Sequence, residues 1–309
     1  MKKGNKKLLV IVGPTATGKT KLAVKLASIF DGEIVSADSR QVYKGMDVGT
    51  GKDLDEYILK ILNYKIQKIN YHCIDVVSPK TDFNLAKYIK CASKAIKNIQ
   101  QRGKLPILVG GTGLYAQAIV DGYSLNNVKP DKELRNSLKK KPIKELQKIL
   151  KKLDPSFQSI IQNKRYLIRY IEIVKQTEKP LTETLQKKGS DYDCLLLGIN
   201  LDREKINKKI DKRLVQRIEN EGLIEEVERL HAEGISWRRL KSFGLEYKHT
   251  TYFVNGITLK DEFIDDLSTA IHQFAKRQMS WLRRWERQGR VINWIKNYSQ
   301  AKKIVKHWL

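Results

Sequence analysis

Gly13-Pro14-Thr15-Ala16-Thr17-Gly18-Lys19-Thr20 follows directly on an apolar run at residues 8–12 and precedes a helical pattern at residues 20–30. This strand, loop and helix predict a phosphate-binding loop, and therefore a ligand that carries a diphosphate or triphosphate. The glycines let backbone N–H groups turn toward phosphate oxygens, and the helix N-terminus adds a partial positive charge. Lys19 would supply a point charge, and the Thr20 hydroxyl would help to hold a Mg²⁺ ion. The alternative is a glycine-rich turn that binds no ligand.

Short apolar strands alternate with helical patterns through the first third of the chain. After the strand at 8–12 we expect strands at 33–37, 71–77 and 105–109, and an amphipathic helix at 84–101. This alternation predicts an α/β fold with a P-loop-type parallel sheet core flanked by helices.

The pattern changes at about residue 121. Up to residue 193 we find no convincing strand, while the segments 131–152 and 155–177 have helical spacing and many lysines. An apolar run at 194–201 then indicates a return to the sheet. We therefore expect a core made of residues 1–120 and 194–309, interrupted by an inserted all-helical subdomain at 121–193. Within the second part of the core, the spacing predicts helices at 203–220, 222–233 and 262–286.

The charge balance points to a polyanionic partner. Among 309 residues, 60 Lys and Arg stand against 34 Asp and Glu, which gives a formal net charge of +26. A biased base composition could explain abundant lysine, but it does not explain the shortage of acids. We therefore favour a nucleic acid or similar polyanion as the partner.

The cysteines and the N-terminus indicate an intracellular protein. Cys73, Cys91 and Cys194 are odd in number and far apart, so they indicate neither a disulfide framework nor a zinc site, and we interpret each as a small core residue. The apolar run near the N-terminus is too short for a signal peptide or a membrane span. We expect a cytoplasmic protein with no membrane partner.

Polar residues follow the ends of the predicted strands. In open parallel sheets, ligands bind at the C-terminal ends of the strands, so the loop at 13–20, the segment 36–41 and the segment 110–113 should converge. Asp38 would then lie near the phosphates, where it could bind Mg²⁺ or remove a proton from a nucleophile; an N-cap is the alternative. The strand at 106–109 ends in Gly-Gly-Thr and not in the acid pair of nucleotide hydrolases. This difference favours a transferase.

Five ordered segments resemble the bacterial tRNA dimethylallyltransferase (tRNA isopentenyltransferase) family. They are GPTATGKT, SADSRQVYKGMDVGTGK (36–52), HCIDVVSP (72–79), PILVGGTGLY (106–115) and AKRQMSWLRR (275–284). The resemblance implies transfer of the dimethylallyl group from dimethylallyl diphosphate to N6 of the adenosine 3′ of the anticodon in tRNA, with release of diphosphate. It also implies that the loop, Lys19, Thr20 and Mg²⁺ hold the diphosphate, that Asp38 takes the N6 proton, and that Thr112 contacts the tRNA near the reacting base.

The resemblance extends to further residues. It assigns a diphosphate contact to Arg213 and tRNA contacts to Asp38, Ser39, Arg40, Gln41, Arg135, Arg165 and Arg169. Two departures from the family pattern are Tyr166, which stands where an arginine is usual, and the segment 243–247. The alternative for the arginines is a solvated surface position. The implied partners are dimethylallyl diphosphate and the anticodon stem-loop of a tRNA bound at the helical insertion, and we expect a monomer.

Other functions remain open from the residues alone. A small-molecule kinase would use the phosphate loop but would not explain the positive charge. An RNA-binding GTPase or ATPase would need hydrolytic motifs that we do not find. An adenylate isopentenyltransferase, which acts on free nucleotide, shares the core motifs but not the lysine-rich insertion. In the C-terminal stretch, Phe274, Trp281 and Trp285 recur at helical spacing, which favours core packing over base stacking.

Overall fold

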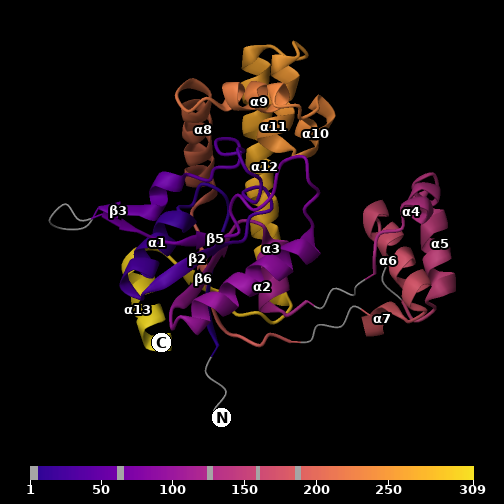
Figure 1. Ribbon diagram of the computed structural model, residues 1–309, viewed down its shortest axis with the longest axis horizontal. Helices are drawn as coiled ribbons and strands as arrows, with labels where there is room; N and C mark the ends of the chain where they lie inside the picture. Colours follow the sequence, from indigo (N-terminus) through magenta and orange to yellow (C-terminus); the bar gives the residue numbers. More distant parts are fainter. Residues whose placement is uncertain (1–5, 61–65, 124–127, 158–160, 185–188) are drawn as a thin grey trace. The chain divides into compact units, whose positions relative to one another are not determined.

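The computed structural model describes residues 6–60, 66–123, 128–157, 161–184 and 189–309 (Figure 1). The chain forms two compact units. One unit consists of Met1–Val120 together with Asp191–Leu309, and the other of Asp121–Ser190. Among the helices of these described ranges, none is long and apolar enough to cross a membrane.

The first unit is built on a parallel sheet, as the sequence predicts. Its strands are β1 (Lys7–Val12), β2 (Gly32–Ser36), β5 (Tyr71–His72), β6 (Leu105–Gly110), β7 (Asp193–Ile199) and β8 (Asn293–Ile295). They lie in the order β5-β2-β6-β1-β7-β8, and every neighbouring pair is parallel. A separate antiparallel hairpin joins β3 (Ile58–Lys60) to β4 (Ile66–Lys68), after a 3₁₀ turn at Leu54–Tyr57.

The prediction of a strand at residues 71–77 is correct for the first two residues and wrong for the rest. Cys73 and Asp75 have positive φ values of 63° and 54°, which no strand can accommodate. The chain therefore turns out of the sheet after His72, and Val77 makes only an isolated parallel bridge with Tyr43.

Helices cover both faces of the sheet, which explains the unbroken apolar run of its central strand β1. Leu9 and Ile11 pack with α1 (Lys19–Ile29) and α13 (Tyr298–Trp308). Leu8 and Val10 pack on the other face with α2 (Leu85–Gln101), α3 (Gly113–Val120) and the end of α12 (Lys260–Arg287). The interpretation of the cysteines as core residues is confirmed for Cys73, which is buried; Cys91 and Cys194 are partly exposed and pack against the same core.

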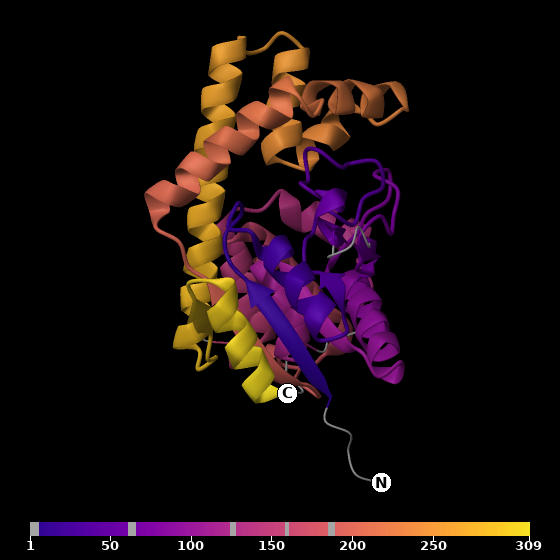
Figure 2. The same ribbon diagram turned by 90° about the vertical axis from the view of Figure 1, so that its left-hand side faces the viewer.

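A group of helices continues the first unit beyond the sheet. It contains α8 (Arg203–Glu219), α9 (Leu223–Ala232), α10 (Trp237–Ser242) and α11 (Leu245–Val254). Figure 2 shows the long helix α12 running from the sheet into this group. The helices predicted at 203–220, 222–233 and 262–286 are confirmed with small shifts at their ends, whereas α10 and α11 were not predicted. Asp202 begins α8 by accepting a hydrogen bond from the backbone of Glu204.

The second unit is helical in its described residues. It contains α4 (Lys132–Lys139), α5 (Ile143–Leu153), α6 (Lys164–Thr177) and α7 (Leu181–Thr184), which share one apolar core. Leu146 and Leu150 of α5 lie on the same face and are buried against Leu167 and Ile171 of α6. The helix predicted from residue 155 begins only at Lys164, because the Asn163 side chain caps it there; residues 158–160 lie outside the described residues.

Candidate active site

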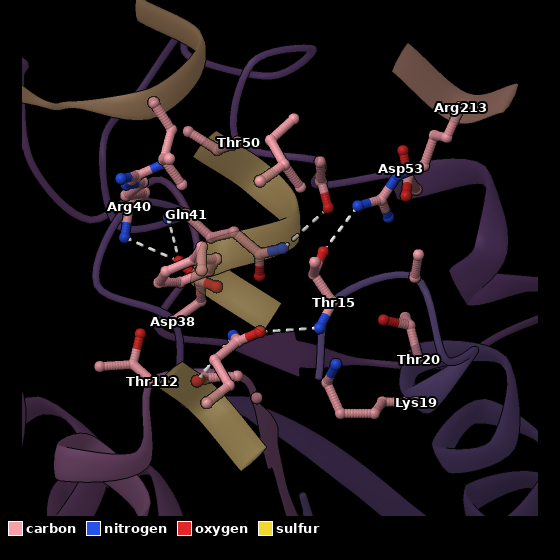
Figure 3. Close-up of a pocket in the computed structure, with 18 of the residues that line it drawn as sticks. Thr15, Lys19, Thr20, Asp38, Arg40, Gln41, Thr50, Asp53, Thr112 and Arg213 are labelled. Carbon is pink, nitrogen blue, oxygen red and sulfur yellow. Dashed lines mark hydrogen bonds between the residues drawn. The ribbon is translucent and has the colours of Figure 1, made fainter. Parts of the chain in front are cut away.

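A cavity of about 660 Å³ lies at the carboxyl ends of β1, β2 and β6 (Figure 3). The predicted site residues that line it are Thr15, Ala16, Gly18, Lys19, Thr20, Asp38, Ser39, Arg40, Gln41, Thr112 and Arg213. Gly13, Pro14 and Thr17 complete the loop without belonging to this lining. The three strand ends therefore converge as the sequence predicts.

The phosphate loop is shaped by residues in the left-handed region. Ala16 and Gly18 have φ values of 60° and 82°, and helix α1 begins directly after Gly18. The Thr17 hydroxyl donates a hydrogen bond to the Pro14 carbonyl at 2.8 Å, and Lys19 Nζ donates to the same oxygen at 2.5 Å. The loop therefore brings the lysine and the N-terminus of α1 to the same side of the cavity, where both favour an anion.

A second cation, Arg213, comes from a distant part of the chain and contacts the loop. Arg213 of α8 donates from Nη2 to Thr15 Oγ1 at 2.6 Å (Figure 3). Burial and the nearby Arg213 charge lower the pKa of Lys19 to about 8, while Asp38 opposes this shift. Burial and the charge of Arg217 lower the pKa of Arg213 to about 10. The pKa values of both cations stay lowered because nearby carboxylates compensate their charges only in part, and a bound diphosphate would add negative charge.

Asp38 and Thr112 lie at neighbouring strand ends. Asp38 Oδ1 accepts hydrogen bonds from the backbone N–H groups of Arg40, at 2.8 Å, and Gln41, at 3.4 Å. The capping role considered for Asp38 is therefore real, although it caps a turn and not a helix, and it orients the carboxylate in the cavity. Thr112 Oγ1 accepts from the backbone of Ser39 at 3.1 Å.

Close packing between β2 and β6 fixes this arrangement. The Thr112 backbone N–H donates to the Ala37 carbonyl at 3.1 Å. A Cβ atom at Gly110 would lie only 2.1 Å from that same carbonyl oxygen. Only glycine permits such an approach, so the Gly-Gly-Thr segment places Thr112 next to the Asp38 turn.

Arg40 and Gln41 are already engaged within the protein. Arg40 forms an ion pair with Glu246 of α11 at 3.0 Å and lies over the ring of Phe274. Gln41 donates from Nε2 to the Gly51 carbonyl at 2.9 Å and accepts from the Ser36 hydroxyl at 2.8 Å. Pairing of the Gln41 amide with a base edge would require these bonds to exchange, and the tRNA contacts of this segment stay predictions.

Sequence reasoning missed Glu226, which holds the loop at residues 47–49. Its carboxylate accepts from the backbone N–H groups of Asp47, Val48 and Gly49, at 2.6, 2.8 and 3.0 Å. It also accepts from the Tyr247 hydroxyl at 2.6 Å and is buried. Helices α9 and α11 thereby fix the loop that carries Thr50 and Gly51 into the cavity wall. The segment 243–247, which departs from the family pattern, helps to hold this loop because it supplies Tyr247.

Gln278 of α12 is a second functional residue that was not predicted from the sequence. It accepts from the Thr15 backbone N–H at 2.8 Å and donates to the Gly111 carbonyl at 2.9 Å. The sequence feature that could have indicated this role is a glutamine among the apolar residues that recur at helical spacing in the C-terminal helix. The prediction of core packing on that stripe is confirmed for Trp285, which is buried, whereas Trp281 lines the cavity.

Two of the three predicted arginines of the second unit form ion pairs with the buried Glu172. Arg135 binds Glu172 with both Nε and Nη2, each at 2.7 Å, and Arg169 binds the same carboxylate. Burial tends to raise the pKa of Glu172, but the hydrogen bonds from the two arginines outweigh it and lower that pKa. Arg165 is instead exposed in the first turn of α6. Arg135 and Arg169 thus have structural partners, and their contacts with tRNA stay predictions.

The cavity also fits the donor set of a Mg²⁺ ion bound together with phosphate. Within the described residues there is no group of three or more His, Cys, Asp or Glu side chains that could hold a metal alone. Mg²⁺ commonly uses one or two side-chain oxygens and takes its other ligands from substrate phosphates and water. Thr20 lines the cavity directly after Lys19, which fits the role that the sequence predicts for it.

Comparisons with known proteins converge on one family. The model described as IPP transferase matches residues 41–285, and the model described as isopentenyl transferase matches residues 6–68. A protein of Treponema denticola named tRNA dimethylallyltransferase 2 is 44% identical over 292 residues, which covers 93% of this chain and 95% of the relative.

Two solved structures are similar over most of the chain. The full-length tRNA isopentenylpyrophosphate transferase of Bacillus halodurans has a TM-score of 0.69 and 31% identity, covering 98% of this chain and 95% of that one. A eukaryotic dimethylallyltransferase acting on tRNA has a TM-score of 0.74 and 26% identity, covering 90% of this chain and 70% of that one.

Proposed function

This chain belongs to the IPP transferase family, and from that premise we propose that it is a tRNA dimethylallyltransferase. It transfers the dimethylallyl group from dimethylallyl diphosphate to N6 of the adenosine 3′ of the anticodon and releases diphosphate. The observation that carries this proposal is that the phosphate loop, Asp38 and Thr112 line one cavity. A diphosphate and an acceptor base can therefore be bound side by side.

The loop and its two cations bind the leaving group. Negative charge grows on the diphosphate oxygen as the C–O bond to the dimethylallyl group breaks. Lys19 and Arg213, whose charges interact and which both line the cavity, are placed to stabilise that charge. Thr20 would hold Mg²⁺, which supplies further charge neutralisation when it is bound with the diphosphate.

Asp38 acts as the general base. Formation of the bond between N6 and the dimethylallyl carbon leaves a surplus proton on the nitrogen, and the carboxylate accepts it. The backbone N–H groups of Arg40 and Gln41 fix the orientation of Asp38 through Oδ1. Thr112 offers a hydroxyl at the adjacent strand end, where it would contact the reacting nucleotide.

The net charge of +26 supports a tRNA as the acceptor, because a folded RNA is the polyanion that such a surface favours. Ser39, Arg40 and Gln41 would contact it at the cavity. Arg135, Arg165 and Arg169 would contact it from the helical second unit. An adenylate isopentenyltransferase is less well supported, since the isopentenyl transferase model matches only residues 6–68.

One reaction separates these alternatives. The protein is incubated with Mg²⁺, dimethylallyl diphosphate and an unmodified tRNA that carries adenosine 3′ of its anticodon, and the nucleosides are identified by mass spectrometry. Parallel reactions contain AMP in place of tRNA, or ATP in place of the prenyl donor. We expect prenylated adenosine at that one position of the tRNA. Prenylated AMP with unmodified tRNA, or phosphoryl transfer from ATP, would overturn the proposal.

The base is tested by Asp38→Asn, because the amide oxygen can still accept the two backbone hydrogen bonds. We expect kcat to fall roughly 100- to 10,000-fold, with tRNA affinity nearly unchanged. Asp55→Asn is the matched control, since Asp55 is exposed and is not part of the cavity lining. A large loss of tRNA binding in Asp38→Asn would instead make Asp38 a binding residue.

A further inference from the structure

Two cysteines that take no part in the proposed reaction lie in contact. Cys73 follows β5, and Cys91 lies in the first half of α2; their Sγ atoms are 3.1 Å apart. Cys73 is buried, with 3% of its surface exposed, while Cys91 is partly exposed. A disulfide bond has an S–S length of about 2.05 Å, so a closing movement of about 1 Å would join them. We propose that Cys73 and Cys91 form a reversible dithiol–disulfide pair that is oxidised by a low-molecular-weight disulfide.

The two thiols differ in a way that assigns their order of reaction. The hydrogen bond from Cys73 lowers the pKa of Cys91 to about 7; burial opposes this shift, and the positive charge of Lys94 supports it. The same hydrogen bond and its own burial raise the pKa of Cys73. Cys91 is therefore both the more accessible and the more readily ionised thiol, which makes it the attacking group.

The exchange balances without any other reactant. The Cys91 thiolate attacks one sulfur of the oxidant, a mixed disulfide forms, and the first small thiolate leaves and takes up a proton. Cys73 then loses its proton to solvent and attacks Cys91 Sγ, and the second small thiolate leaves and is protonated. Two protein thiols are oxidised to one disulfide, and the small disulfide is reduced to two thiols.

The cross-link would restrain a segment that supports the site. Beyond Cys73, the backbone of Asp75 donates to the Gln41 carbonyl at 3.0 Å, and that of Val76 donates to the Val42 carbonyl at 2.9 Å. The disulfide would thus tie α2 to the chain that backs Gln41. A cross-link that fits the folded state reduces the conformational freedom of the unfolded chain, so the oxidised protein should unfold at a higher temperature.

The test uses the full-length folded protein and glutathione disulfide. After oxidation, remaining thiols are alkylated in denaturant, and the protein is cleaved after lysine. We expect peptide 69–80 linked to peptide 91–94, with the loss of two hydrogen atoms, while Cys194 is alkylated. Dithiothreitol should restore alkylation of both cysteines. Two alkylated thiols, a stable mixed disulfide at Cys91, or linkage only in denaturant would each overturn the proposal.

Variants separate the pair from a general effect of oxidation. Cys91→Ser lies on a partly exposed helix surface and should fold, yet it should form no cross-link and show no shift in thermal midpoint after treatment. Cys194→Ser is the matched control and should behave as the unmodified sequence does, with a raised midpoint. An equal midpoint shift in Cys91→Ser, or no shift in Cys194→Ser, would contradict the stabilising cross-link. None of these measurements depends on the enzymatic activity.

Discussion

Replacement of Arg213 by methionine tests the diphosphate site most directly. The change removes the guanidinium group that lies 2.6 Å from Thr15 Oγ1 but keeps an unbranched apolar chain. A hydrogen bond from a charged group contributes about 1.5–3 kcal/mol, which corresponds to a roughly 10- to 150-fold loss in kcat/KM for dimethylallyl diphosphate. The pKa of Lys19 should also rise, because the Arg213 charge is one of its two lowering causes.

The assay measures initial rates at saturating tRNA and varied dimethylallyl diphosphate, at constant pH and ionic strength. Lys212→Met is the matched control: it removes a positive charge one residue away on the same helix, from an exposed side chain at the cavity rim. An exposed charge contributes less than about 1 kcal/mol, so this variant should lose at most about five-fold, and less at high salt. Equal losses in the two variants, or an unchanged kcat/KM for dimethylallyl diphosphate in Arg213→Met, would refute a specific diphosphate contact by Arg213.

Three further outcomes follow from the charges and hydrogen bonds of the structure. The value of kcat/KM for dimethylallyl diphosphate should fall as the pH rises above about 8, where Lys19 loses its proton. The variant Lys19→Arg should lack this decrease. An identical decrease in both proteins would contradict the assignment of the decrease to Lys19. Glu226→Gln should raise the KM for dimethylallyl diphosphate and lower the free energy of unfolding by about 1–3 kcal/mol, because an amide cannot accept all four hydrogen bonds. The control variant Glu225→Gln, at an exposed neighbouring position, should change neither quantity. The hydrogen bond from Arg102 lowers the pKa of Glu33 to about 2 despite burial. The stability that the ionised Glu33 contributes is therefore present above about pH 4.5 and is lost as the pH falls toward 2. In denaturant titrations, the difference in free energy of unfolding between the unmodified protein and Glu33→Gln should disappear over that interval.

Regular elements of the fold were predictable because local pattern and tertiary environment agree in them. The apolar run of β1 is a central strand covered on both faces, and the stripe of α12 packs on the core. The strand predicted at 71–77 failed because Cys73 and Asp75 adopt left-handed conformations that no hydrophobic pattern reveals. Helix α11 was not predicted for a related reason. It begins directly after Gly244, at Leu245, which has a positive φ of 36° that the hydrophobic pattern does not reveal.

The parts of the site that are contiguous in sequence were predictable, whereas their supports were not. The phosphate loop, Asp38 and Thr112 each follow a strand, so topology alone places them together. Glu226 lies 177 residues from Gly49, and Gln278 lies 263 residues from Thr15. A charged residue on a helix is ordinarily solvated, and only the folded structure shows that Glu226 is buried against backbone N–H groups.

The electrostatics of the cavity explain why a phosphate loop can serve a leaving group here. Lys19 and Arg213 are cations whose pKa values are lowered by burial, so the protein by itself stabilises their charges poorly. In the proposed reaction a diphosphate would compensate them on binding, and it would carry still more negative charge as its C–O bond breaks. The attraction therefore grows along the reaction coordinate, and an interaction that is stronger in the transition state than in the ground state accelerates the chemical step. In the proposed reaction the same two cations would bind the donor and favour its departure. Asp38, which opposes the pKa shift of Lys19, lines the same cavity, where the proposed mechanism makes it the base.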